Sequence, residues 1–211
     1  MVIKSKISPL TIQRLSTYLR GLKYFAQEEG KASVSSDDIA LWLGGTAAQV
    51  RKDLSYFGSF GKKGRGYNVD ELIKTLEDIL GLDKSWKVAL IGLGRLGRSM
   101  AVYKGFRNSS FEIVAIFDID PQKVGTKYNE TPVYHLDDLT RVCEEEGILI
   151  SIVATPAEVA NKVFQIALDA GIRGILNLSG RSSFNPPPHA FIKDVNMEAE
   201  IESLSFCLTH Y

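Results

Sequence analysis

The stretch between residues 87 and 118 restricts the fold of this chain more than any other part of the sequence. Residues 87–91 are a short apolar run with β-branched side chains, which predicts a strand buried on both faces of a parallel sheet. The residues from Gly92 to Gly97 then follow the spacing G-x-G-x-x-G, and a helix is expected over 95–103. A second apolar run at 111–117 ends on Asp118. This order predicts a strand–helix–strand unit of an α/β domain.

The glycine spacing and the acid at the end of the second strand together indicate a dinucleotide site. Gly92 allows a tight turn, Gly94 lets the backbone approach a pyrophosphate, and Gly97 lets the helix pack closely on the strand. Asp118 lies 21 residues after Gly97, where a carboxylate accepts hydrogen bonds from ribose hydroxyls and repels a 2′-phosphate. We therefore expect NAD and NADH as cofactors, although an empty pocket or another nucleotide such as coenzyme A fits the same fold. The candidate cofactor-binding residues are Gly92, Leu93, Gly94, Arg95, Leu96, Gly97 and Asp118.

The length and composition fit one large or two small globular domains. The chain has 211 residues, 45% of them hydrophobic, which is enough for ordinary cores. No segment approaches the ~20 apolar residues of a membrane span, and the N-terminus lacks the apolar region of a signal peptide. We therefore expect a cytoplasmic protein with no membrane partner. Cys143 and Cys207 have no C-x-x-C spacing, which predicts two buried free cysteines and no disulfide or metal site.

Three helix-start signals in the first 57 residues predict a helical N-terminal domain. Ser8 followed by a proline opens the first helix, which runs toward Gly30. Ser35 opens the second in a near capping-box arrangement, and Thr46 opens the third in the form T-x-x-Q. The apolar contacts expected of the second helix are Ile39, Leu41 and Leu43.

The second and third helices, joined by a glycine turn, fit a helix-turn-helix whose second member enters the major groove of DNA. Residues 46–66 hold five basic residues and one acidic residue, and residues 60–67 predict a hairpin with a basic tip, as in a winged-helix protein. A structural or partner-binding module is the alternative, because a charge run is usually only a solvated face. The candidate DNA-binding residues are Thr46, Gln49, Arg51, Lys52, Ser55, Tyr56, Lys62, Lys63 and Arg65.

The α/β alternation continues after Asp118. A helix over 69–80 and a linker at 81–86 precede the glycine unit. Near the end of the chain, the proline run at 185–188 predicts a rigid extended loop. Thr155 with the proline after it is expected to cap a helix. The elements predicted after Asp118 are strands at 133–135, 148–154 and 173–178 and helices at 136–146 and 156–170.

The last segment, residues 197–211, predicts a helix with a wide apolar surface that must be buried somewhere. It can cover its own sheet or be donated to a second subunit, and both arrangements stay open. A DNA reader of this kind usually works as a two-fold dimer, which favours the second. The predicted domains are a winged helix at 1–82, a Rossmann domain at 83–195 and a dimerisation helix at 196–211.

The order of these parts resembles the Rex family of bacterial redox-sensing transcriptional repressors over nearly the whole chain. The most selective stretch is residues 49–58, QVRKDLSYFG, followed by the wing at 61–67 and by residues 79–82. The resemblance implies a homodimer that binds operator double-stranded DNA, exchanges its C-terminal helices and releases DNA when NADH rises relative to NAD. It also implies that Arg51, Lys52, Ser55 and Tyr56 face the DNA.

The resemblance further implies an interdomain contact, and this chain departs from the family pattern near it. Arg20 and Tyr103 match the members of the contact, while Asn196 stands where an acid is usual. Leu178, Ser179 and Gly180 stand where the family commonly has Phe-Ala-Pro. A Rex-like DNA-binding protein with a weakened NADH response is therefore an alternative.

An NAD-dependent dehydrogenase is the rival from another class, and a nucleotide-binding module with only a protein partner is a third. Nearly all residues after the linker are needed for the sheet and its helices, which leaves no substrate domain. His135, His189 and His210 lie at a strand end, in the proline loop and near the terminus, so none is favoured as an acid or base. We expect no catalytic residue and no metal site.

Overall fold

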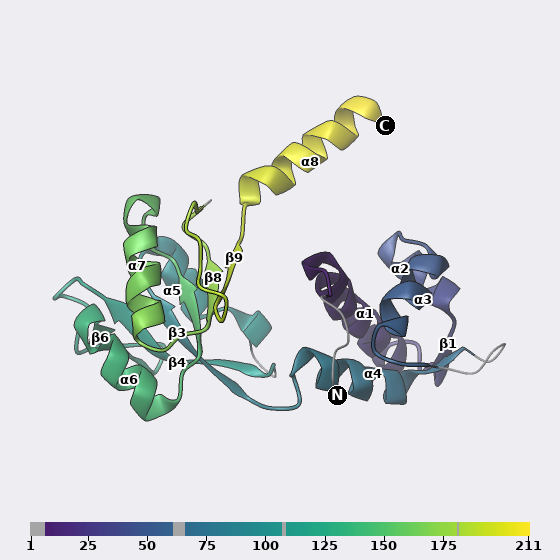
Figure 1. Cartoon of the computed structure of the whole chain (residues 1–211), viewed down its shortest axis with the longest axis horizontal. Helices are drawn as coiled ribbons and strands as arrows, with labels where there is room; N and C mark the ends of the chain where they lie inside the picture. The colour runs from purple at the N-terminus through teal and green to yellow at the C-terminus, as the bar shows by residue number, and fades with distance from the viewer. Residues whose placement is uncertain (1–6, 61–65, 107–108, 181) are drawn as a thin grey trace. The chain divides into compact units, whose positions relative to one another are not determined.

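The computed structural model describes residues 7–60, 66–106, 109–180 and 182–211 of the chain. It has two compact units, Met1–Lys84 and Ser85–Tyr211, whose elements are labelled in Figure 1. The N-terminal unit is mainly helical and the C-terminal unit is built on a mostly parallel sheet, so the predicted α/β class is confirmed. No helix among the described residues is long and apolar enough to cross a bilayer.

The helices of the N-terminal unit begin at the caps that the sequence predicts. Ser8 and Thr46 each accept a hydrogen bond from the backbone N–H three residues further on, and Ser35 and Asp38 complete a reciprocal capping box. These bonds satisfy N–H groups that have no partner within the helix. The elements are α1 (Pro9–Gln27), β1 (Ser33–Val34), α2 (Ser36–Leu43), α3 (Ala47–Ser55), β2 (Tyr67–Asn68) and α4 (Val69–Leu80).

One apolar core holds these helices together. Leu15 from α1, Leu54 from α3 and Leu76 from α4 are almost completely buried in it. The prediction that Leu41 is an apolar contact of α2 is wrong, because Leu41 is 85% exposed, whereas Ile39 is buried. Two residues along a helix correspond to a rotation of about 200°, which turns Leu41 away from the core.

The small sheet of this unit differs from the predicted hairpin. Tyr67 and Asn68 form a strand, but they pair antiparallel with Val34 and Ser33. Phe60, the other end of the predicted hairpin, lies outside any strand. The strand partner therefore comes from the segment between α1 and α2, which is too distant in sequence for a local hairpin pattern to reveal. The predicted basic tip, residues 61–65, lies outside the described residues.

The C-terminal unit is built on a seven-stranded sheet of order β5-β6-β4-β3-β7-β8-β9. The central strand β3 pairs in parallel with β4 on one side and β7 on the other, while β5 is antiparallel to β6 at the edge. Except for β5, this is the strand order of doubly wound dinucleotide-binding folds. In these folds the order in which successive strands are added reverses between the strands that correspond to β3 and β7. The strands are β3 (Trp86–Ile91), β4 (Phe111–Asp118), β5 (Lys127–Tyr128), β6 (Thr131–His135), β7 (Ile150–Val153), β8 (Gly174–Asn177) and β9 (Phe191–Asp194). The strands β5 and β9, which were not predicted, lie at the two edges of the sheet.

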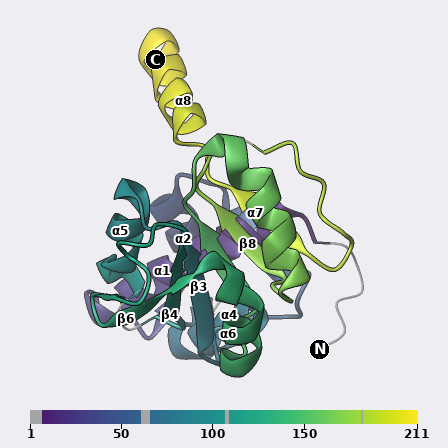
Figure 2. The same cartoon turned by 90° about the vertical axis from the view of Figure 1, so that its left-hand side faces the viewer.

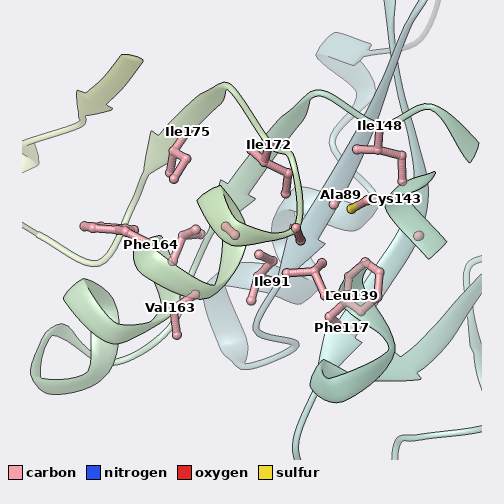
Figure 3. Packing of buried hydrophobic residues seen from close by; sticks show 14 of the residues in the cluster. Ala89, Ile91, Phe117, Leu139, Cys143, Ile148, Val163, Phe164, Ile172 and Ile175 are labelled. Carbon is pink, nitrogen blue, oxygen red and sulfur yellow. The ribbon is translucent and has the colours of Figure 1, made fainter. Parts of the chain in front are cut away.

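Helices lie on both faces of this sheet (Figure 2). The helices α6 (Leu139–Glu146) and α7 (Ala157–Asp169) cover one face over a cluster that contains Ile91, Phe117 and Phe164 (Figure 3). The opposite face packs Leu90 and Ile116 under α5 (Arg95–Ala101), which ends two residues earlier than predicted. Two 3-10 turns, Lys104–Phe106 and Leu136–Asp138, complete the unit.

The start of α7 differs from its prediction. Pro156 is the N-cap, not the first helical residue, and there is no side-chain cap hydrogen bond. The hydroxyl of Thr155 lies instead 3.4 Å from the hydroxyl of Ser179, which follows β8. Thr155 therefore contacts the residue that follows the neighbouring strand β8 and does not cap α7.

The last helix, α8 (Met197–His210), is exposed along its whole length and covers neither face of the sheet in Figure 2. Met197, Ile201, Leu204 and Leu208 are 62–87% exposed and follow the spacing of a single helical stripe. The predicted apolar surface is therefore present, but the chain itself does not bury it. We call these four residues the α8 stripe.

The two cysteines have opposite environments. Cys143 on α6 is buried, as predicted, and burial raises the pKa of its thiol to about 11. Cys207 is exposed, so the prediction that it is buried is wrong for the single chain. The reason is its position on α8, where every side chain is exposed.

Candidate functional site

The exposed side of α3 presents a mixed basic and polar surface. Arg51, Lys52, Ser55 and Tyr56 are all exposed there, and we call these four residues the α3 surface. The guanidinium of Arg51 donates a 2.7 Å hydrogen bond to the Ser36 hydroxyl at the start of α2, which limits the freedom of this long side chain. The structure thus brings together the four residues that were predicted to face DNA.

Beneath the α3 surface, Asp53 is fully buried and joins α3 to α1. Its carboxylate accepts two hydrogen bonds from Arg14, at 2.6 and 2.8 Å, and one from the Tyr18 hydroxyl at 2.7 Å. The side-chain amide of Gln49 donates a fourth at 2.8 Å. Gln49 was predicted to be free for DNA, but in the single chain this bond ties it to the buried acid.

The charge state of this cluster follows from its hydrogen bonds. Burial pushes the pKa of Asp53 up, but the donors on Arg14, Tyr18 and Gln49 outweigh burial and hold the pKa below 3.8. The same carboxylate raises the pKa of Arg14 above its ordinary value, and burial with this bond raises that of Tyr18. A bidentate ion pair therefore fixes the position of α3 on α1 at neutral pH. This role of Asp53 was not predicted, because in the sequence it is only the one acid in a basic region.

The remaining predicted DNA contacts are at the two ends of this region. Thr46 is exposed at the start of α3, where its hydroxyl caps the helix. Lys62, Lys63 and Arg65 lie outside the described residues, so their role stays a prediction from the sequence.

The glycine motif forms the turn between β3 and α5. Gly92 has φ +98°, and a Cβ atom there would lie 2.7 Å from the carbonyl oxygen of Ala154. Gly97 is equally restricted, because a Cβ atom would collide with the carbonyl oxygen of Gly92. Gly94 is different: nothing lies within 4 Å of a Cβ position there, so that side of the turn is open. This geometry matches the predicted roles of tight turn, open approach and close packing.

Asp118 lies at the end of β4, next to this turn. One carboxylate oxygen accepts hydrogen bonds from the backbone N–H of Leu93 at 2.7 Å and from Lys123 Nζ at 3.1 Å, and the other accepts from the N–H of Asp120 at 2.9 Å. Burial raises the pKa of Asp118, but these donors outweigh it and hold the pKa below 3.8. The carboxylate is therefore ionised at neutral pH and is fixed beside the glycine turn.

A cleft of about 460 Å³ opens at the carboxyl ends of β3, β4 and β7. Gly92, Gly94 and Asp118 line it, together with two basic residues that the sequence analysis did not select, Lys123 and Lys162. Such an edge is where ligands bind in open α/β sheets. A basic residue five positions after the terminal acid is the signal that points to Lys123.

The residues assigned to an interdomain contact lie in different units. Arg20 is exposed on α1, and Tyr103 is 54% exposed with its ring packed edge-to-face on Phe106 at 5.3 Å. Asn196 caps α8 by accepting hydrogen bonds from the N–H groups of Glu198 and Ala199.

The three histidines are exposed or half-buried, and the Nδ1 atom of His135 lies 3.2 Å from a carboxylate oxygen of Asp137. His135 accepts a 3.3 Å hydrogen bond from the N–H of Asp137 and caps a 3-10 turn. Among the described residues, no group of histidine, cysteine or acidic side chains has the arrangement of a metal site.

Two family models match separate segments of the chain. A model described as the CoA binding domain matches residues 83–180, and a model described as the putative DNA-binding protein N-terminus matches residues 6–55.

Curated relatives match over nearly the full length. The redox-sensing transcriptional repressor Rex of Chloroflexus aurantiacus (strain ATCC 29366 / DSM 635 / J-10-fl) is 41% identical over 206 residues, which cover 97% of this chain and 96% of the relative. The protein of the same name from Carboxydothermus hydrogenoformans is 43% identical over 201 residues, 95% of this chain and 96% of the relative.

Solved structures of RSP, a Rex-family repressor, have the same fold. The complex of RSP with β-NAD+ and operator DNA superposes with a TM-score of 0.89 at 33% identity and covers 97% of this chain and 94% of that one. The complex of RSP with β-NADH gives a TM-score of 0.86 at 31% identity, with 97% and 95% covered.

Proposed function

Because the chain belongs to the Rex family of redox-sensing transcriptional repressors, we propose that it binds operator double-stranded DNA as a homodimer and responds to the ratio of NADH to NAD. The observation that carries this proposal is the combination, in one chain, of the α3 surface with the glycine cleft and its terminal acid. The family is one of regulators, so the chain is not an enzyme. We place it in the cytoplasm, where a bacterial repressor meets DNA.

The α3 surface is the part proposed to enter the major groove. Arg51 and Lys52 supply positive charge, Ser55 and Tyr56 supply hydroxyl groups, and Asp53 holds the helix in place from below. We assign Thr46 and Gln49, at the start of α3, to the base edges, which requires Gln49 to exchange its hydrogen bond to Asp53 for one to a base. We assign Lys62, Lys63 and Arg65 to the DNA backbone on the sequence alone.

The cleft at the end of β3 is the proposed NAD(H) site. The open side at Gly94 accommodates the pyrophosphate, and the ionised Asp118 accepts hydrogen bonds from the adenosine ribose. Leu93, Arg95, Leu96 and Gly97 complete the turn. The complexes of RSP with β-NAD+ and β-NADH support this cofactor over coenzyme A.

The homodimer proposal rests on two apolar surfaces of the C-terminal unit. The α8 stripe is exposed, and an entirely apolar hollow of about 250 Å³ lies on the sheet face opposite α6 and α7. Val88, Ile113, Ile152 and Leu176 contribute to the lining of this hollow. Burying both surfaces is favourable at roughly 25 cal/mol per Å². We propose that α8 of a second copy covers the hollow, so that the subunits exchange their last helices.

A contact between the two units would connect nucleotide binding to DNA binding. We propose Arg20, Tyr103 and Asn196 as its members. Asn caps a helix about as well as Asp, so Asn196 keeps the start of α8 intact while it lacks the negative charge of the acid that is usual at this position. This neutral residue favours the second candidate function, a Rex-like repressor with a weakened NADH response.

Titration of a fluorescent operator complex with NADH and with NAD tests the proposal. A ligand changes an equilibrium only through its different affinity for the two states, so NADH should release DNA at lower concentration than NAD. Linkage requires operator DNA to weaken NADH binding by the same factor. Equal release by NADH and NAD would contradict redox sensing. Absence of specific binding to any promoter fragment would contradict repression.

A further inference from the structure

Two hydroxyl groups lie together at the carboxyl ends of β7 and β8. Thr155 follows β7 and Ser179 follows β8, and their side-chain oxygens are 3.4 Å apart. Both residues are half-buried. Thr155 also lines the glycine cleft, where its methyl group lies 3.1 Å from a Cβ position on Gly92. Thr155 therefore borders the cleft, and the Ser179 hydroxyl lies directly beside it.

A buried side chain fixes the position of this pair. Asn177 is fully buried, and its side-chain oxygen accepts a 2.8 Å hydrogen bond from the N–H of Ser179. Its amide nitrogen donates to the carbonyl of Gly180 at 2.6 Å and to the carboxylate of Asp194 at 2.7 Å. Ser179 is thus held by the last residue of a core strand, and the pair needs little rearrangement to accept a ligand.

The strand order determines which half of a dinucleotide reaches this pair. Asp118 ends β4 and marks the ribose of the adenosine half, and the glycine turn at the end of β3 marks the pyrophosphate. The nicotinamide half therefore extends across the switch point toward β7 and β8, where Thr155 and Ser179 lie. We propose that these two hydroxyls bind the carboxamide of the nicotinamide ring, an inference that rests on the proposed NAD(H) site.

The chemistry of the pair fits a carboxamide. A hydroxyl has one hydrogen to donate and two lone pairs that accept. When the hydroxyls of Thr155 and Ser179 hydrogen-bond to each other, one hydroxyl hydrogen and several oxygen lone pairs remain for a ligand. A carboxamide offers an acceptor oxygen and two N–H donors, so it uses both kinds of group. The carboxamide is the same in NAD and NADH, so the contact contributes affinity for both redox forms.

Calorimetry on the full chain with four nucleotides tests this assignment. The variants are Thr155→Val, Ser179→Ala and the double variant, with Thr140→Val on the exposed side of α6 as a matched control. NAD and NADH should each bind the double variant roughly tenfold more weakly, as expected for loss of one or two neutral hydrogen bonds. ADP-ribose lacks the nicotinamide and should bind unchanged, which also shows that the variants fold. The 3-acetylpyridine analogue of NAD has a methyl group in place of the amide nitrogen and should lose less affinity than NAD.

Three results would overturn the assignment. Unchanged NADH affinity in the double variant would show that the hydroxyls do not contact the nucleotide. An equal loss of affinity for ADP-ribose would place the hydroxyls against the ribose or the phosphates. A loss confined to one redox form would show that the ring charge, not the carboxamide, is sensed. If the wild-type chain bound none of the four nucleotides, the proposed NAD(H) site itself would fail, and this inference with it.

Discussion

At the scale of single residues, Asp53 is a buried charge whose partners determine its contribution to stability. The Asp53→Asn variant keeps the shape but breaks the ion pair with Arg14. Arg14 is 36% exposed and can return to water, whereas Tyr18 is buried and cannot. We therefore expect a loss of about 2–3 kcal/mol in the free energy of unfolding. Urea unfolding of the full chain measures it, with Asp37→Asn in the exposed first turn of α2 as the control.

The pH dependence of that difference follows from the depressed pKa of Asp53. A carboxylate with a lower pKa in the folded state stabilises the fold above its unfolded pKa, and this stability is lost as the pH falls through the folded pKa. The difference between wild type and Asp53→Asn should be constant from about pH 5 to pH 8 and should shrink below about pH 4. A difference that already shrinks near neutral pH would contradict this charge state.

Asp118 gives a second prediction at the residue scale, about nucleotide choice. Its carboxylate repels a 2′-phosphate and holds Lys123. In Asp118→Ala, NADH should bind about 1.5–3 kcal/mol more weakly, because a hydrogen bond to a charged group is lost. NADPH should gain affinity relative to NADH, since the repulsion is gone and Lys123 is released. Calorimetry with NADH, NADPH and coenzyme A on wild type, Asp118→Ala and Asp118→Asn is the measurement. Preferential binding of coenzyme A by the wild type would refute the NAD assignment.

At the scale of an element, the buried Asp53 fixes α3 to α1, and the opposite side of α3 exposes the charged Arg51 and Lys52. We assign the Lys52 ammonium to DNA phosphates, so Lys52→Ala should weaken binding of operator and non-operator DNA alike. Each lost phosphate contact should reduce the slope of log K against log salt by about 0.9, and by about 1.8 in a symmetric dimer. Fluorescence anisotropy at several salt concentrations measures the slope. Lys74→Ala on the exposed side of α4 is the control, and an identical slope in both variants would contradict the assignment.

At the scale of the whole molecule, two DNA-binding units must match the spacing of successive major grooves, about 34–36 Å or a multiple. The proposed dimer depends on the α8 stripe, so Leu204→Asp should give a monomer with much weaker operator binding. Sedimentation velocity measures the oligomeric state, and Glu202→Ala on the same helix is the matched control. A chain ending at Asn196 should behave like Leu204→Asp. A persistent dimer in both would show that another surface holds the subunits together.

Features that depend on near neighbours along the chain could be predicted before the structure was known. The caps at Ser8, Ser35 and Thr46 depend on contacts within three residues, and the turn from Gly92 to Gly97 depends on the close approach of Gly97 to the Gly92 carbonyl. The α/β class and the place of the cofactor cleft could be predicted for the same reason, because a strand, a tight turn and a helix in this order already define the edge of a sheet.

Which distant residues become partners depends on how the folded chain packs. Asp53 binds Arg14 across 39 positions, β2 pairs with β1 and not with the chain at Phe60, and the hydroxyl of Thr155 lies beside that of Ser179 and does not cap α7. The physical reason is that a side chain with two possible hydrogen-bond partners takes the one that packing brings into reach. Local pattern cannot report that choice, because it depends on how the helices and strands come together.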